Sequence, residues 1–105
     1  AESSAIIRER ICACRKIQGS RYRLRSYKTN SQMNPKDIKE FATPDLQGRK
    51  LIEMAMKELH LSARAYYKIL KIARTISDLA SCELILSEHL AEAIQYRSLD
   101  RQWYG

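Results

Sequence analysis

Most of the chain carries apolar residues three and four positions apart, which is the spacing of one face of an amphipathic α-helix. No stretch alternates clearly between apolar and polar residues as a half-buried β-strand does. In the first helical stretch the apolar stripe consists of Ile6, Ile7, Ile11, Ala13, Cys14 and Ile17. Ser3 or Ser4 is suited to cap this helix, which we expect to reach about residue 24 with a weak point at Gly19. Residues 26–32 are polar and predict a loop.

Two pairs of residues in the middle of the chain have the pattern of helix starts. In Asn34-Pro35 and in Thr43-Pro44 a capping side chain stands directly before a proline, which favours the first helical position. The first pair predicts a short helix that ends near Phe41, and the second predicts a longer helix. The residues expected on the inner face of the longer helix are Leu51, Ile52, Ala55, Met56 and Leu59.

The stretch from residue 63 to about residue 81 predicts the central helix of a bundle. Ser62 is its expected N-cap, and its wide apolar face suits a helix that several neighbours contact. The residues expected on this face are Tyr66, Ile69, Leu70, Ile72, Ala73, Ile76, Leu79 and Ala80. Ser87 is then expected to cap a last helix. The inner face of this last helix is predicted to consist of Leu90, Ala93, Ile94 and Arg97.

Together these stretches predict an all-α fold, a small bundle of about five helices. The 105 residues form one domain, in which we assign residues 35–98 to the bundle and residues 99–105 to a tail that is loose or docks through Trp103. Composition agrees, because 45% apolar residues are too many for a disordered chain. The 3 glycines and 2 prolines are too few for a many-turned β-sandwich.

The positive charge of the chain is concentrated near its beginning. The formal net charge is +7, and in the first 30 residues eight Lys and Arg stand against Glu2 and Glu9. The residues predicted to contact DNA or another subunit are Arg8, Arg10, Arg15, Lys16, Arg21, Arg23 and Arg25. Tyr22 and Tyr27 interleave with the last of these, a pattern that fits nucleic-acid phosphates or an acidic neighbour. A solvated helix face explains the same charges, and the sequence leaves the choice open.

The lack of targeting segments and the number of cysteines indicate the cellular compartment in which we expect the chain. No apolar run approaches the ~18 residues of a membrane span, and the first residues lack the apolar block of a secretory signal. The absence of an initiating Met leads us to expect a piece of a longer protein. Cys12, Cys14 and Cys82 are an odd number without framework spacing, which indicates reduced thiols and a cytoplasmic location. Because the chain has only His60 and His89, far apart in sequence, we expect no metal site.

The residue sets of common active sites are missing from the sequence. The chain contains no phosphate loop of the GxxxxGK[ST] kind, no HExxH and no GxSxG. Its carboxylates are scattered, at Asp37, Glu40, Glu53, Asp78, Glu88 and Glu92 among others. We therefore expect no catalytic residue in this chain alone.

Arg64 breaks a rule of helix sequence. It lies in the first turn after Ser62, where the positive end of the helix dipole disfavours a cation by about 0.3–1 kcal/mol. Residues that break local rules are often functional, and backbone N–H groups with a guanidinium form an anion site that suits phosphate. Lys68 and Lys71 follow at i+4 and i+7 and extend a basic edge. The alternative is an arginine that is merely exposed to solvent.

At this helix the sequence resembles a known family. Residues 61–80, LSARAYYKILKIARTISDLA, resemble the C-terminal domain of magnesium-chelatase-like AAA+ ATPases, in the group of the ComM (YifB) competence proteins. Residues 88–97, EHLAEAIQYR, look like the closing motif of that group, and residues 3–10, SSAIIRER, look like its junction with the ATPase core. The sequence departs at His60, where glycine is common, and at Tyr67, where histidine is common, so any role tied to that histidine lapses.

The resemblance implies the helical lid of a AAA+ ATPase, joined to its core through residues 1–24. By motif, Arg64 is the sensor-2 arginine, which reaches the γ-phosphate of ATP bound in the core. The nucleotide-binding loop, the magnesium-binding carboxylates and the arginine finger belong to that core, so ATP and Mg²⁺ are cofactors of the parent protein. Further implied partners are neighbouring subunits of a hexamer ring and, since the ComM group is associated with DNA processing, DNA.

Two other classes compete with the lid. An independent DNA-binding helical module would rely on the basic first helix, but no convincing helix-turn-helix with a polar recognition face is present. A helix that lies on a membrane surface is disfavoured because Ile11, Cys14 and Ile17 form a narrow face without Trp or Phe.

Overall fold

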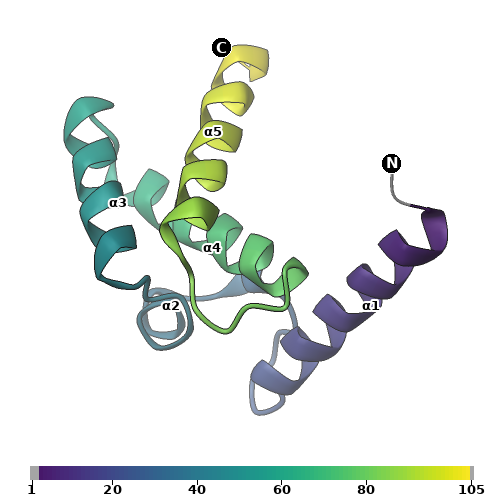
Figure 1. Ribbon diagram of the computed structural model, residues 1–105. Helices are drawn as coiled ribbons and strands as arrows, with labels where there is room; N and C mark the ends of the chain where they lie inside the picture. Colours follow the sequence, from purple (N-terminus) through teal and green to yellow (C-terminus); the bar gives the residue numbers. More distant parts are fainter. Residues whose placement is uncertain (1–2, 105) are drawn as a thin grey trace.

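A computed structural model of the chain describes the backbone of residues 3–104 and the side chains of residues 3–96. Its elements are α1 (Ser4–Arg21), the 3-10 helix η1 (Asn30–Gln32), α2 (Pro35–Phe41), α3 (Leu46–Glu58), α4 (Ala63–Leu79) and α5 (Ser87–Tyr104). Over these described residues the structure contains no β-strand, and an isolated bridge joins Pro44 to Ile85. The predicted all-α bundle of about five helices is confirmed (Figure 1).

Three of the predicted helix caps are confirmed. The side-chain oxygens of Ser3, Asn34 and Ser62 accept backbone N–H groups three residues onward, at 3.3, 2.8 and 3.2 Å. Each bond satisfies one of the N–H groups that the first turn of a helix leaves without an internal partner. The starts of α1, α2 and α4 therefore follow from local sequence.

The predicted helix start at Thr43-Pro44 is wrong. The cap of α3 is Asp45, whose Oδ1 accepts the N–H of Gly48 at 2.8 Å. The Thr43 hydroxyl instead donates to a carbonyl at the end of α2 at 2.6 Å, and Pro44 pairs with Ile85. The Asp45 N–H also donates to the Ile85 carbonyl, at 3.2 Å. A contact between two distant loops has displaced the helix start.

Other helix ends differ from their predicted positions by one to a few residues. α1 runs through Gly19 and ends at Arg21, whose side chain turns toward the interior, rather than near residue 24. α4 ends at Leu79, because Ser81 has the left-handed φ of 54°, which helical backbone does not adopt. Ser87 is the first residue of α5 rather than the residue before it.

The end of α5 lies partly beyond the described side chains. The helix continues to Tyr104 and so includes residues 99–104, which the sequence separates as a tail. The inner-face position predicted for Arg97 and the docking predicted for Trp103 concern side chains outside the described residues.

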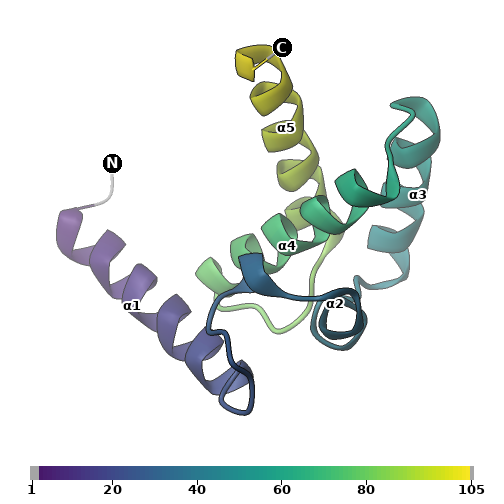
Figure 2. The ribbon, with the colours of Figure 1, turned by 180° about the vertical axis from the view of Figure 1, so that it is seen from behind.

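α4 is the central helix of the bundle. It contacts α1, α2, α5 and η1, and α3 packs against α5 (Figure 1 and, from behind, Figure 2). Its predicted apolar face is confirmed at the buried residues Ile69, Leu70 and Ala73, with the positions on either side half-buried. Ala80 is exposed, so its predicted burial is wrong, because the helix ends one residue before it.

The predicted apolar stripe of α1 is buried only in its second half. Cys14 is 4% exposed, whereas Ile6, Ile7 and Ile11 are 48%, 45% and 39% exposed. The first half of α1 projects from the bundle, with its N-terminal end far from α4 (Figure 1). α1 is therefore held by its C-terminal half, where it meets α4.

A buried polar group, which we call the Asp78 cluster, joins α1 to α4 and consists of Arg21, Tyr22, Asn30, Arg74 and Asp78. Asp78 is 1% exposed and accepts two bonds from the Arg21 guanidinium, both at 2.7 Å. Asn30 donates to Asp78 at 2.8 Å and accepts the Tyr22 hydroxyl at 2.6 Å. Burial lowers the pKa of Arg21, but its hydrogen bonds to Asp78 and the Asp78 charge outweigh this and raise it overall.

Arg74 also fixes the loops around α4. Its two terminal nitrogens donate to the carbonyls of Phe41 at 3.1 Å, Glu83 at 2.8 Å and Cys82 at 2.8 Å. Its Nε lies 3.2 Å from an Asp78 oxygen as an ion pair, without the direction of a hydrogen bond. Burial lowers the pKa of Arg74, and the Asp78 charge opposes this shift. One buried side chain thus joins the end of α2 to the loop before α5.

The cysteines are free thiols, with Cys12 exposed, Cys14 buried and Cys82 half-buried. Within residues 3–96, His, Cys, Asp and Glu side chains do not gather in groups of three or more that suit a metal ion. None of the helices within the described residues has the length and hydropathy needed to span a membrane.

Candidate functional site

The start of α4 presents a cation where the backbone offers N–H groups. Arg64 is the second residue of α4, and its side chain is exposed. Ser62 takes up the N–H of Ala65, so the cap leaves other first-turn N–H groups of the helix without an internal acceptor. The position of Arg64 in the first turn is the one that the sequence predicts.

Arg64 lines a pocket of about 780 Å³ where α4 lies beside η1 and α2. Lys68 and Lys71 line the same pocket, so the structure brings together the three cations that helical spacing places on one edge. The other lining residues are Ser31, Met33, Pro35, Ile38, Ser62, Ala65, Tyr67 and Ile72. Within this lining three side chains are cationic and none is acidic. The pocket has the charge and the donors to bind an anion such as phosphate.

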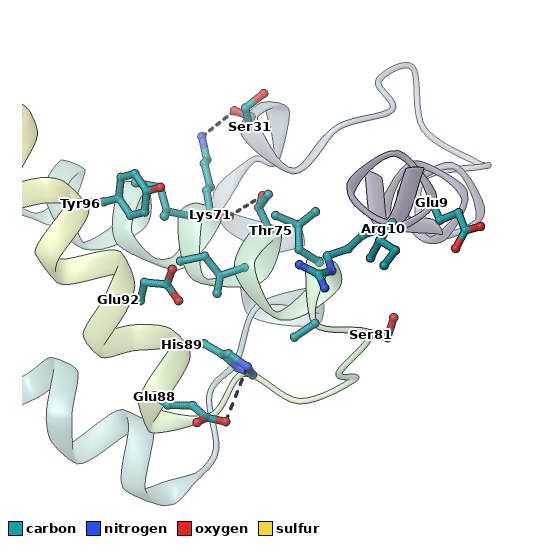
Figure 3. A pocket seen from close by; sticks show the side chains of 15 residues that line it. Glu9, Arg10, Ser31, Lys71, Thr75, Ser81, Glu88, His89, Glu92 and Tyr96 are labelled. Carbon is teal, nitrogen blue, oxygen red and sulfur yellow. Dashed lines mark hydrogen bonds and ion pairs between the residues drawn. The ribbon is translucent and has the colours of Figure 1, made fainter. Parts of the chain in front are cut away.

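The three cations differ in their surroundings. Arg64 and Lys68 are exposed, while Lys71 is half-buried at the end of the pocket near η1. The Lys71 ammonium donates to the backbone carbonyl of Ser31 at 3.2 Å (Figure 3). The structure therefore ties Lys71 to a neighbouring element.

The basic residues near the beginning of the chain divide into two groups. Arg21 belongs to the Asp78 cluster, and Arg25 donates to Asp37 at 3.0 Å and approaches Glu40 at 3.4 Å. The hydrogen bonds to Asp37 raise the pKa of Arg25. Both guanidinium groups form ion pairs within the fold, which makes Arg21 and Arg25 less suited to the predicted DNA or subunit contact than the exposed residues are. The exposed members of the predicted set are Arg8, Arg10, Arg15, Lys16 and Arg23.

A larger groove of about 1210 Å³ lies beside the pocket, between α1, α4 and α5 (Figure 3). α4 forms its floor, and Ser31, Lys71 and Ile72 line both the groove and the pocket. On the α5 wall, His89 accepts the Leu86 N–H through Nδ1 at 3.0 Å and so caps the helix. The polar and charged residues of the walls include Glu9, Arg10, Glu88, His89 and Glu92.

The Asp78 cluster is the main feature that the sequence analysis misses. Arg74 and Asp78 are four residues apart and lie beside the buried positions Leu70, Ala73 and Ser77 of α4. Charged residues on a predicted buried face require partners, which is the signal that was available. The partner Arg21 is 57 residues away from Asp78, so no local pattern identifies it.

Comparison with known proteins agrees with this architecture. The family model described as magnesium chelatase, subunit ChlI C-terminal, matches residues 1–97, and the chain belongs to this family. Within it, the chain is 39% identical over 100 residues to the protein named competence protein ComM of Haemophilus influenzae. It is 35% identical over 100 residues to the uncharacterized protein YifB of Escherichia coli, and equally to YifB of Salmonella typhimurium. Each match covers 95% of this chain and 19% of the relative, so the chain spans a small part of their length.

Proposed function

We propose that this chain is the lid domain of a AAA+ ATPase of the magnesium-chelatase-like class, and that Arg64 contributes to ATP hydrolysis as its sensor-2 arginine. The observation that carries the proposal is the position of Arg64 at the start of α4, with Lys68 and Lys71, on a pocket without a lining carboxylate. An arginine donates two parallel hydrogen bonds to phosphate oxygens and stabilises the negative charge that they carry.

In the proposed reaction the ATPase core and this chain have different roles. The core binds ATP and Mg²⁺, and Mg²⁺ supplies the neutralisation of phosphate charge. Arg64 adds a donor at the γ-phosphate, while Lys68 and Lys71 add positive charge along the same edge. Loss of the γ-phosphate removes the acceptor, so the position of α4 relative to the core changes with hydrolysis. Because α4 contacts α1, α2 and α5, such a change moves the whole domain.

The test is the change Arg64→Ala in the parent protein, the ATPase core joined to this chain. Removal of one donor from the phosphate is expected to lower ATP turnover about tenfold or more, measured by phosphate release under saturating ATP. Arg49→Ala, at an exposed arginine of α3 outside the pocket, is the matched control and should leave turnover unchanged. Turnover unaffected by Arg64→Ala would show that the arginine does not serve the reaction.

DNA is a second proposed partner, because five exposed basic residues remain beside the internal arginines, and four of them lie outside the groove that Arg10 lines. Arg8, Arg15 and Lys16 lie on one face of α1, and Arg23 follows its end. An exposed strip of this kind contacts phosphates without reading base sequence. In the parent protein the same strip is also available to a neighbouring subunit of a hexamer ring.

Binding of this chain to duplex DNA is expected to weaken steeply with salt. Four phosphate contacts correspond to a slope of about −3 to −4 in a plot of log affinity against log salt concentration, measured by fluorescence anisotropy. Changing Arg8, Arg15, Lys16 and Arg23 to glutamine should abolish binding. The same change at the exposed Lys50 and Lys57 of α3 should not. An absence of binding at low salt excludes this role for the chain alone.

A further inference from the structure

Lys71 stands between the pocket and the element that anchors α1. Lys71 lines the pocket. Its ammonium donates to the Ser31 carbonyl of η1 at 3.2 Å, the bond drawn in Figure 3. A second connection runs through the Lys71 carbonyl, which accepts the Thr75 hydroxyl at 3.1 Å. Thr75 Oγ1 in turn accepts the Asn30 side chain at 3.1 Å. Lys71 is therefore tied to η1 through both its side chain and its backbone.

η1 is tied to α1 by the residue next to Ser31. Asn30 is 1% exposed, and its side-chain oxygen accepts Arg21 at 3.0 Å and the Tyr22 hydroxyl at 2.6 Å. Its backbone N–H donates to the Gln18 side chain at 3.0 Å. Three side chains from the last turn of α1 and the residue after it therefore contact one residue of η1. A shift of η1 stretches these hydrogen bonds. Each lost bond is costly, because no water reaches the buried Asn30 to replace the missing partner.

We propose that Lys71 is a positioning residue that transmits occupation of the pocket to the attachment of α1. When a phosphate enters beside Arg64, the Lys71 ammonium exchanges the Ser31 carbonyl for a phosphate oxygen. The ammonium is an ionised donor in both bonds, but only the phosphate adds the attraction between opposite charges, so the exchange is favourable. η1 then loses its tie to α4 through Ser31, and the contacts of Asn30 with Gln18, Arg21 and Tyr22 loosen. The inference rests on the proposed function of the Arg64 pocket and names the route by which its state reaches α1.

The expected effect is set by the bond that is lost. The Lys71–Ser31 hydrogen bond lies at an exposed site. Its loss is expected to make local opening at the end of α1 about two- to tenfold more frequent. Amide hydrogen exchange of residues 18–25 reports this opening. In this segment the Tyr22 N–H donates to the Gln18 carbonyl at 3.0 Å, and the Arg25 N–H donates to the Tyr22 carbonyl at 2.9 Å.

The experiment measures this exchange by mass spectrometry in the parent protein, with and without saturating Mg²⁺ and adenylyl imidodiphosphate, an ATP analogue that is not hydrolysed. The unmodified protein should exchange about two- to tenfold faster in this segment when the analogue is bound. In Lys71→Met the exchange should already be fast without the analogue and should not rise further. Lys57→Met, at an exposed lysine of α3, is the matched control and should respond like the unmodified protein.

Binding of the ATP analogue is verified in every variant by its displacement of a fluorescent nucleotide. Slow exchange in Lys71→Met without the analogue, or an undiminished response with it, overturns the inference. ATP turnover of Arg64→Ala separates the two proposals. If turnover depends on Arg64 but residues 18–25 ignore the analogue, the route through Lys71 fails alone. If turnover does not depend on Arg64, the proposed function fails and the inference fails with it.

Discussion

Replacing Asp78 with asparagine is expected to lower the free energy of unfolding by about 3–5 kcal/mol, the cost of breaking a buried ion pair by removing one partner. The Arg21 and Arg74 guanidinium groups, with side-chain exposures of 12% and 6%, both depend on this carboxylate. Asparagine preserves the shape but not the charge, and its amide group presents hydrogens where two arginines already donate. Urea denaturation followed by circular dichroism measures the loss.

The control and a double variant distinguish a lost network from a general effect of charge. Glu53→Gln, at an exposed carboxylate of α3, should change the free energy of unfolding by no more than about 0.5 kcal/mol. In a chain that already carries Arg21→Met, the further change Asp78→Asn should cost less than it does alone, because the two residues share one interaction. A loss below about 1 kcal/mol for Asp78→Asn alone would mean that the cluster is not a main support of the fold.

Gly48→Ala is expected to destabilise the chain by about 1–3 kcal/mol, although alanine favours a helix over glycine by about 1 kcal/mol. A Cβ atom at position 48 would lie 2.7 Å from Leu90 Cδ1, 2.9 Å from Pro44 Cβ and 3.0 Å from Asp45 Oδ1. Leu90 is fully buried and cannot move away without disturbing the contact between α3 and α5. The steric cost therefore exceeds the gain in helix propensity.

The same substitution at Gly19 should have the opposite sign. No atom lies within 4 Å of a Cβ built there, and the residue lies inside α1, so the variant gains about 0.5–1 kcal/mol from helix propensity. The free energies of unfolding of the two variants should thus differ by about 1.5–4 kcal/mol, measured in parallel urea titrations. Equal values would contradict the close approach of α3 to α5.

The sequence predicts most helices correctly because their signals are local. Ser3, Asn34 and Ser62 cap residues three positions away, and apolar spacing identifies the buried face of α4. The start of α3 escapes prediction, because Pro44 pairs with Ile85 in a loop 41 residues onward, and tertiary contacts override a good local signal. The exposed stripe of α1 escapes for a related reason: periodicity shows which residues share a face, but not whether another helix covers it.

The residues of the candidate site likewise include some that the sequence predicts and some whose roles only the fold reveals. Arg64, Lys68 and Lys71 follow from helical spacing and from a cation in an unfavourable first turn, and the structure gathers them on one pocket. The roles of Arg21 and Arg25 do not follow, since net charge counts exposed and buried arginines alike. Only the fold reveals that Arg21 faces Asp78 and that Arg25 faces Asp37.

The projecting helix α1 has the geometry of a lever. Its 18 residues make it ~27 Å long, and its buried residue Cys14 and the ion pair of Arg21 with Asp78 lie in its C-terminal half. A tilt of about 10° at the C-terminal end would displace the first turn by about 5 Å, more than the length of any hydrogen bond that holds the helix. A small displacement of the backbone around Asn30 and Asp78 is thus enlarged at the N-terminal end of α1, where Ile6 and Ile7 lie.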